Sequence, residues 1–169
     1  SNGIYSAAVA GGGAKDVAVF GSFAVNSLHK TVSASVSNST MNSSGDILMS
    51  AQADAVIRSL AGSVAVSLGA AGVGGAGTYN TIRDKSLVTL ENSDISADNV
   101  LANAGRSGSV KTLGAAAGIA STAGVQGSTA ITTLAGQTAT AVQGGTITAQ
   151  NRAVIGADSS VDTVTTAGG

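Results

Sequence analysis

The chain contains no cysteine, proline or tryptophan, and only 2% of its residues are aromatic and 10% charged. An ordinary soluble domain carries about 25% charged residues. Without cysteine, a disulfide framework, a thiolate metal site and a cysteine nucleophile are all excluded. A net charge of -1 offers no basic footprint, so we expect no nucleic-acid partner. Low charge combined with a hydrophobic share of 43% also argues against disorder.

Small residues take the place of these types. The chain has 31 Ala, 24 Gly, 23 Ser and 17 Thr, which together make 95 of its 169 residues. This length suits one domain or one slice of a longer array, and the slice is the better interpretation. The start shows no charged segment followed by an apolar one and a cleavage site, so we expect no signal peptide there.

A repeat of about 53 residues runs through the whole chain. Equivalent positions carry equivalent residues, as in Asp46, Asn99 and Arg152; Ile4, Ile57 and Val110; Leu28, Ile82 and Leu134; and Asn26, Asn80 and Thr132. The repeat units are approximately 4–56, 57–109 and 110–160, followed by a stub at 161–169. We therefore treat residues 1–169 as a single repetitive segment, because such periods are typical of stacked architectures.

The local pattern within each unit predicts strands. Val and Thr alternate with other residues, and glycine recurs too often for a stable helix. Asn38-Ser39, Asn92-Ser93 and Gly144-Gly145 occupy matching positions, where Asn or Gly adopts the left-handed backbone of a tight bend. These features predict an all-β fold, a parallel β-solenoid with two long or three shorter coils per unit, forming a rod roughly 30 to 45 Å long.

Two long stretches carry no charge, one between Arg58 and Arg83 and one of 40 residues between Lys111 and Arg152. In residues 60–77 both strand faces carry small or apolar residues, which predicts strands covered on both sides. One hypothesis is a protruding β-hairpin from Ile57 to Ile82, with hairpins of successive units stacked into a second sheet. The runs are long enough for a membrane helix, but Ser, Thr, Gly and Gln dilute them, so we do not expect membrane insertion.

Residues that carry chemistry are scarce. His29 is the single histidine, which excludes a zinc site built on paired histidines. Glycine-rich segments such as 72–75 are not followed by the Gly-Lys-Ser or Gly-Lys-Thr of a phosphate loop. The aspartates are scattered rather than grouped. We therefore assign no catalytic, metal-binding or cofactor-binding residue, and expect no cofactor and no enzymatic activity.

One charged cluster emerges when the repeats are aligned. His29 and Lys30 fall opposite Arg83 and Asp84 of the next unit, with Lys85 beside them. Coils that stack in register would bring these five residues together in a polar patch at a bend. The patch is either a solvated turn that discourages aggregation or a contact point for a partner.

A second aligned pair is Arg58 and Lys111, one repeat apart. These two cations either contact an acidic glycan or simply face water.

The order of residue types within each repeat unit resembles that of a known group of proteins. Segments 17–26 and 62–66, an Asn-Ser bend and then Gly-Asp-Ile or Asp-Asn-Val are similar to the repeats of very large Gram-negative surface adhesins. These are the filamentous haemagglutinin-like and leukotoxin-like filamentous adhesins exported by type V secretion, and the resemblance covers essentially the whole chain. It implies a right-handed parallel β-helix, an extracellular location on the bacterial cell surface, and a host-cell or bacterial surface protein or glycan as partner. It carries over no binding residue.

The expected function is a structural and adhesive segment of such an adhesin, mediating attachment to host cells or other bacteria. One alternative is a β-helix enzyme that acts on polysaccharide. Another is an ice- or surface-binding rank of threonines formed by Thr138, Thr140, Thr146 and Thr148, for which the first unit aligns Ser33, Ser35, Thr40 and Asn42. Because a slice of a solenoid exposes sheet edges, end-to-end self-association is also expected.

Overall fold

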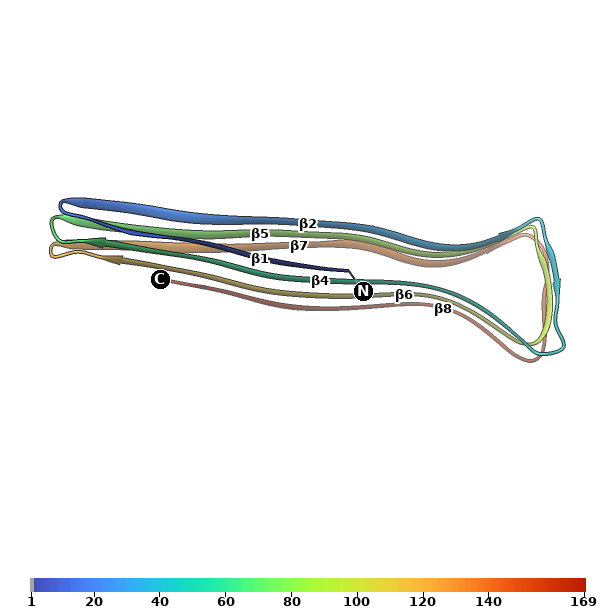
Figure 1. The fold of residues 1–169 in the computed structure, drawn as a ribbon. Helices are drawn as coiled ribbons and strands as arrows, with labels where there is room; N and C mark the ends of the chain where they lie inside the picture. Colours follow the sequence, from blue (N-terminus) through green and yellow to red (C-terminus); the bar gives the residue numbers. More distant parts are fainter. Residues whose placement is uncertain (1) are drawn as a thin grey trace.

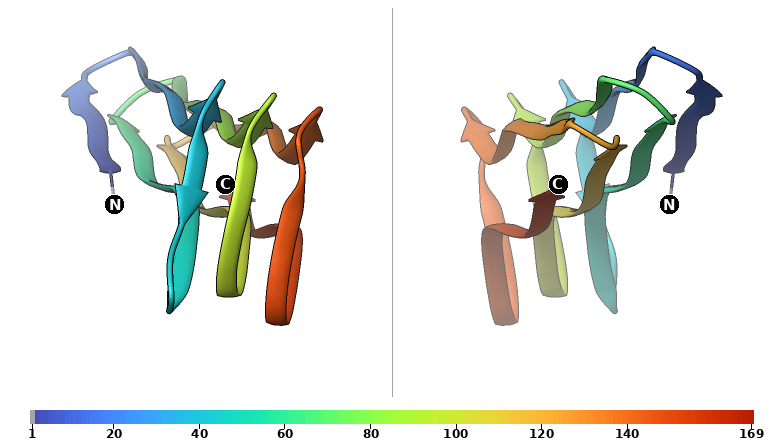
Figure 2. Two further views of the ribbon diagram at one scale, coloured as in Figure 1. Left: turned by 90° about the vertical axis from the view of Figure 1, so that its right-hand side faces the viewer. Right: turned by 90° about the vertical axis from the view of Figure 1, so that its left-hand side faces the viewer.

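The computed structural model describes residues 2–169 and confirms the all-β, parallel solenoid (Figure 1). The strands are β1 (Asn2–Ala14), β2 (Val17–Ser37), β3 (Thr40–Asn42), β4 (Asp46–Ser67), β5 (Ala71–Glu91), β6 (Asp94–Ile119), β7 (Ala123–Gln143) and β8 (Ile147–Gly168). The chain winds as a right-handed coil (Figures 1 and 2), the hand that connections between parallel strands of one sheet almost always take. In the described residues no helix is long and apolar enough to span a membrane.

Two long sheets and one short side make up the wall of each coil. Sheet A contains β1, β4, β6 and β8, and sheet B contains β2, β5 and β7. The short side is formed by β3 and the first residues of β6 and β8, which Figure 2 shows as three upright ribbons. One coil therefore uses a whole repeat, which corrects the expectation of two or three coils per unit.

The solenoid is consequently a flat blade rather than a rod along the stacking axis. Its long strands, such as the 21-residue β2, extend about 70 Å at 3.3 Å per residue. Four stacked strands in sheet A span only about 14 Å in the other direction. The strands continue through their glycines, as β5 does through Gly74 and Gly75, so each coil has two long sides.

The register of the stacked strands agrees with the sequence repeat. Ile4 lies beside Ile57, which lies beside Val110, and Asn26, Asn80 and Thr132 stack in the same way. Offsets of 53 residues in sheet A, and of 54 and then 52 in sheet B, are those of the sequence alignment. The repeat therefore predicted which residues are neighbours, although it did not predict the path of the chain between them.

The predicted bends at the corners are also confirmed. Asn38 and Asn92 have φ values of 49° and 47°, and Gly144 and Gly145 have values of 70° and 81°. This left-handed backbone is readily adopted by Gly and tolerated by Asn, which explains their presence at the matching corner of each coil. The Asn92 amide donates to the Asn38 side-chain oxygen at 3.5 Å, so the corner residues also stack.

The interior tapers along the blade. At the wide end, where the short side separates the sheets, the core contains large side chains such as Ile47, Met49, Leu90 and Ile95. Further along, a second cluster contains Ile57, Ile82 and Val110. At the narrow end the buried apolar cluster consists of alanines, namely Ala24, Ala61, Ala76 and Ala116.

Beyond these alanines the two sheets touch through their backbones. A Cβ atom added to Gly74 would clash with the carbonyl oxygen of Ala117, and one added to Gly118 would clash with that of Val125. Glycine is therefore required at these inward positions for steric reasons. The abundance of Ala, Gly and Ser follows from this close approach of the two sheets.

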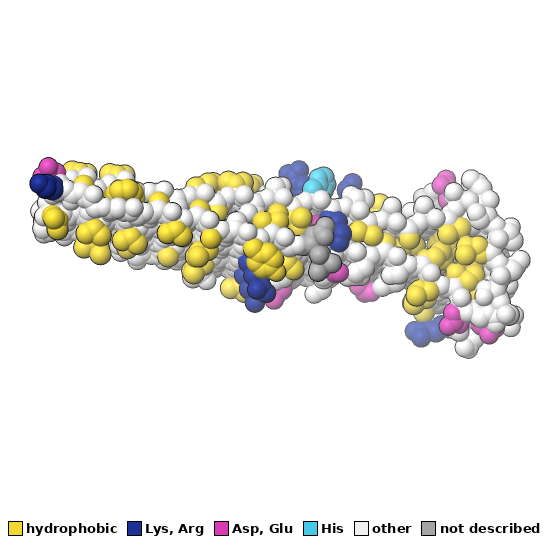
Figure 3. Space-filling model, viewed as in Figure 1, with side chains coloured by type: hydrophobic (Ala, Val, Ile, Leu, Met, Phe, Trp, Pro, Cys, Tyr) yellow, Lys and Arg dark blue, Asp and Glu magenta, His cyan; other side chains and the backbone are white. Residues whose placement is uncertain are grey.

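Two expectations for residues 57–82 are wrong. The chain does reverse direction between β4 and β5, but the two strands belong to different sheets and pair with neighbouring coils, so no hairpin protrudes. Nor are both faces covered, because outward side chains such as Leu60, Val64 and Leu68 are 39%, 45% and 80% exposed. Figure 3 shows hydrophobic side chains on the surface of the narrow part of the blade, where charged side chains appear only at the tip.

Candidate binding surfaces

The predicted patch lies in the middle of two long strands rather than at a bend. His29 and Lys30 belong to β2, and Arg83, Asp84 and Lys85 belong to β5, with His29 paired to Arg83 and Lys30 to Asp84. Because side chains alternate across a strand, the five residues separate into two groups. The solenoid thus brings them together, as expected, but on opposite sides of sheet B.

The outward group is His29, Arg83 and Lys85, all exposed on the outer face of sheet B. They border a shallow hollow of about 310 Å³, whose other wall is formed by residues 135–137 of β7. The hollow exists because Ala135 of the third coil, which pairs with Arg83, has only a methyl group on this face. Three basic side chains beside an open floor can accommodate an anionic group.

The inward group forms a charged cluster inside the blade. Asp84 is 1% exposed, and its Oδ2 atom lies 4.0 Å from Nε of Arg106, a β6 residue that is 8% exposed. The guanidinium group lies against Gly136, where any Cβ atom would clash with it. Lys30 approaches from the first coil and donates to the backbone oxygen of Asp54 at 3.4 Å.

Burial determines the electrostatics of this cluster. It raises the pKa of Asp84 above the ordinary value, and the nearby charges of Arg106, Lys30 and His29 oppose that rise only in part. Neither carboxylate oxygen of Asp84 has a hydrogen-bond partner among the described residues. Removing one member of a buried ion pair costs about 3–5 kcal/mol, so this group is structurally important even without a ligand.

A polar ladder lies beside the charged cluster. The Asn26 amide donates to the Asn80 oxygen at 2.8 Å, and the Asn80 amide donates to the Thr112 hydroxyl at 2.7 Å. All three residues are buried. Buried amides that satisfy one another across successive coils favour one stacking register over its alternatives.

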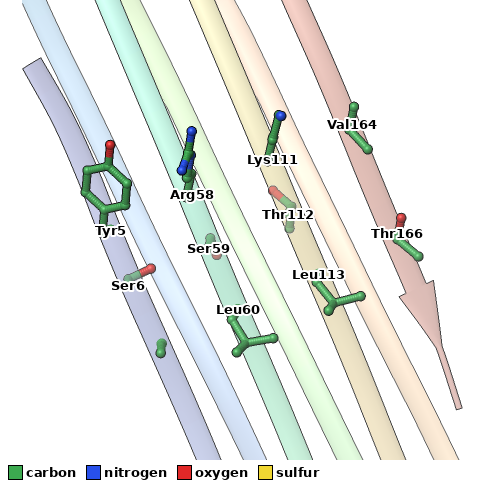
Figure 4. Close-up of a pocket in the computed structure, with 11 residues that line it drawn as sticks. Tyr5, Ser6, Arg58, Ser59, Leu60, Lys111, Thr112, Leu113, Val164 and Thr166 are labelled. Carbon is green, nitrogen blue, oxygen red and sulfur yellow. The ribbon is translucent and has the colours of Figure 1, made fainter. Parts of the chain in front are cut away.

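The outer face of sheet A carries a second basic group. Tyr5, Arg58 and Lys111 lie side by side on β1, β4 and β6 (Figure 4). The Arg58 guanidinium is 5.6 Å from the centre of the Tyr5 ring, a cation–π distance. A shallow depression of about 600 Å³ includes this row and the neighbouring Leu60 and Leu113. The alignment of Arg58 with Lys111 is thus confirmed, and both point outward.

The threonine rank does not form. Thr140 donates to the backbone oxygen of Gly156 across the interior, and the Thr138 hydroxyl is also buried, whereas Thr146 and Thr148 are exposed. Strand pairing also places Thr138 on Ser86, which pairs with Val32 rather than the expected Ser33. The alternation of the strands therefore separates the four threonines.

Two residues of these surfaces were missed from the sequence, Arg106 and Tyr5. Arg106 shares its strand parity with buried Val100, Ala102, Ala104 and Val110, so the two-residue alternation of β6 could have placed it inside. Tyr5 is 53 residues before Arg58, so the repeat alignment could have placed it next to the cations.

Comparison with known proteins adds no relative, since no family model, curated protein or solved structure matches the chain. Within residues 2–169, no group of three or more His, Cys, Asp or Glu residues is arranged to hold a metal ion.

Proposed function

We propose that this chain is a structural and adhesive segment of an extracellular bacterial surface adhesin, exported by type V secretion. In this role it contributes to attachment to host cells or other bacteria. The observation that carries the proposal is the identity of repeat and coil: each unit of about 53 residues completes one turn and pairs with the next along its whole length.

Such a unit can be added repeatedly without changing its neighbours, which is how solenoids build long structures. Each added coil also extends both outer faces of the blade. A row of side chains on one face, such as Tyr5, Arg58 and Lys111, then presents one group per coil at the strand spacing of about 4.8 Å. A repetitive surface of this kind suits attachment to repetitive ligands through many weak contacts.

The resemblance to the filamentous adhesin repeats supports the same role, and the absence of cysteine agrees with export through an oxidising compartment. A polysaccharide-acting enzyme stays a prediction that a hydrolysis assay on bacterial and host polysaccharides tests.

Attachment can be tested with beads coated with the whole chain. We expect such beads to bind epithelial cells or bacteria more than beads coated with an unrelated solenoid, and the coated protein to bind members of an array of surface glycans and proteins. The triple variant with His29, Arg83 and Lys85 replaced by Ala reports whether the outer face of sheet B is used. A second variant, with Arg58 and Lys111 replaced by Ala, reports whether the outer face of sheet A is used. Beads that bind no better than the unrelated solenoid, together with an empty array, would contradict the proposal.

A further inference from the structure

The outer face of sheet B is apolar over the narrow half of the blade. Large side chains point outward there and are between 38% and 66% exposed: Val19, Phe23, Val25, Tyr79, Val125 and Ile131. We call these six residues the apolar field. No charged residue occurs in 17–28, 71–82 or 123–143, the parts of the three strands that carry it. The Phe23 ring lies over Gly77, where any Cβ atom would clash with it, so the absence of a side chain at Gly77 makes room for the ring.

These side chains have no place inside the chain. The interior between the sheets at this level holds small residues such as Ala24, Ala61 and Ala76, and the inward ring of Phe20 lies there over Gly12, where no side chain competes for the space. Stacking of further coils would cover the strand edges but leave this face in water. Exposed apolar patches bordered by polar residues mark interaction sites.

A basic border lies directly beside the apolar field. His29, Arg83 and Lys85 point outward further along β2 and β5, after Ser27 and Thr81. Asp84, which lies between Arg83 and Lys85 in the sequence, points inward toward Arg106. Its negative charge therefore does not neutralise the two positive charges on the outer face. Among the described residues on the outer face of sheet B, the one acidic side chain is that of Glu91, which lies at the far end of β5.

The combination distinguishes between two occupants. A second copy packed through the same face would cover the apolar field, but the carboxylate that it brings on that face, Glu91, lies at the far end of β5. An anionic lipid surface meets both requirements, because acyl chains accept aliphatic and aromatic side chains while phosphate and carboxylate headgroups attract Arg and Lys. Tyr79 and Phe23 are aromatic residues, of which Tyr in particular is enriched at the level of the headgroups.

We propose that the outer face of sheet B adsorbs to an anionic lipid bilayer. The apolar field enters the boundary between headgroups and acyl chains, and His29, Arg83 and Lys85 lie over the headgroups. Adsorption by one face leaves the coil edges in water, so no unpaired backbone group has to enter hydrocarbon. The inference goes beyond the proposed function, whose partners are surface proteins and glycans.

The test is flotation of the whole chain with phosphatidylcholine vesicles that contain or lack phosphatidylserine, at low and high salt. We expect binding to the anionic vesicles, which high salt weakens, and little binding to the neutral ones. The Arg83→Gln/Lys85→Gln variant should bind about 25-fold more weakly, because each cation near an anionic surface contributes about fivefold. Phe23→Ser should lower binding about tenfold, since it removes an exposed aromatic side chain that anchors the face.

The matched control is Arg58→Gln/Lys111→Gln, which removes the same charge from sheet A and should change binding less than twofold. Absence of flotation with anionic vesicles would overturn the proposal, as would an equal loss in the sheet A control. A dimer detected by light scattering that Phe23→Ser abolishes, without vesicle binding, would identify a second copy as the occupant instead. Bead attachment to cells is measured separately, so either proposal can fail while the other stands.

Discussion

Side chains alternate between inward and outward positions at both ends of the blade, but the large apolar residues point inward at the wide end and mostly outward at the narrow end. At the wide end large apolar residues such as Leu90 and Val100 point inward and polar residues such as Ser35 and Gln52 point outward. At the narrow end small residues such as Ala65 and Ser63 are buried, and Val64 and Val66 face water. The separation of the sheets, rather than hydrophobicity alone, therefore decides which side chains the interior can hold.

Separation is in turn set by the third side of the coil. The short side of β3 and the starts of β6 and β8 keeps the sheets apart at the wide end, whereas a three-residue turn at 68–70 joins them directly at the narrow end. Most large residues at the narrow end therefore lie at outward positions, and the inward ring of Phe20 is accommodated over Gly12. The lipid surface proposed above would cover those outward side chains that belong to sheet B.

The comparison predicts that equivalent leucines differ in their contribution to stability. Leu90→Ala, at a fully buried position of the wide end, should lower the free energy of unfolding by about 2–5 kcal/mol because it leaves a cavity. Leu60→Ala, at an outward position of the narrow end, should change it by about 0.5 kcal/mol or less. Urea denaturation followed by circular dichroism measures both values. Similar losses for the two variants would mean that the outer face of the narrow end is covered in solution.

Two neighbouring glycines of β5 test the backbone contact between the two sheets. Gly74→Ala should destabilise the chain by about 1–3 kcal/mol, because its Cβ atom would force the sheets apart at the Ala117 carbonyl. Gly75→Ala should be neutral or stabilise by up to about 1 kcal/mol, since no atom lies within 4 Å of its Cβ atom and the unfolded chain loses freedom. Thermal unfolding of the two variants tests the pair. Equal stability would show that the sheets are not in backbone contact there.

The same two ends show how far the sequence predicts the structure. Repetition predicted the register, because stacked coils place identical positions next to each other, and it predicted the corners at Asn38 and Asn92, because few residues adopt a positive φ. It did not predict the coil size. Gly72, Gly74 and Gly75 lie inside β5, where the first two fill inward positions that no side chain can occupy.

The candidate patch was predictable only in part for a similar reason. The repeat placed His29 opposite Arg83 correctly, but a bend was assumed at residues that continue a strand, so the alternation was not applied to them. Counting parity from buried Ile82 and Val88 would have placed Asp84 inside and Arg83 outside. Arg106 could not have been paired with Asp84 from the sequence, because that contact crosses from one sheet to the other.

Two aspartates, one inside the blade and one on its outer face, make the stability depend on pH in opposite ways. Burial raises the pKa of Asp84, so the folded chain binds its proton more tightly than the unfolded chain, whose Asp titrates near 3.8. The resulting stability is fully present below pH 3.8 and is lost as the pH rises through the folded pKa. Hydrogen bonds from Gln52 and Ser107 instead lower the pKa of Asp54, on the outer face of sheet A. Its contribution is present above pH 3.8 and is lost as the pH falls below that value.

Unfolding midpoints measured across the acidic range should separate the two groups. Asp84→Asn should flatten the curve above pH 3.8, and Asp54→Asn should flatten it below, so that each variant changes the slope on one side of pH 3.8 and keeps the wild-type slope on the other. The reason is that each substitution removes one titrating carboxyl group while keeping its shape. Asp84→Asn also lowers the whole curve, because Arg106 loses its buried partner. An Asp84→Asn variant that keeps the wild-type slope above pH 3.8 would mean that the Asp84 carboxyl group is accessible to water, and therefore that the sheets open at the boundary between the wide and narrow ends.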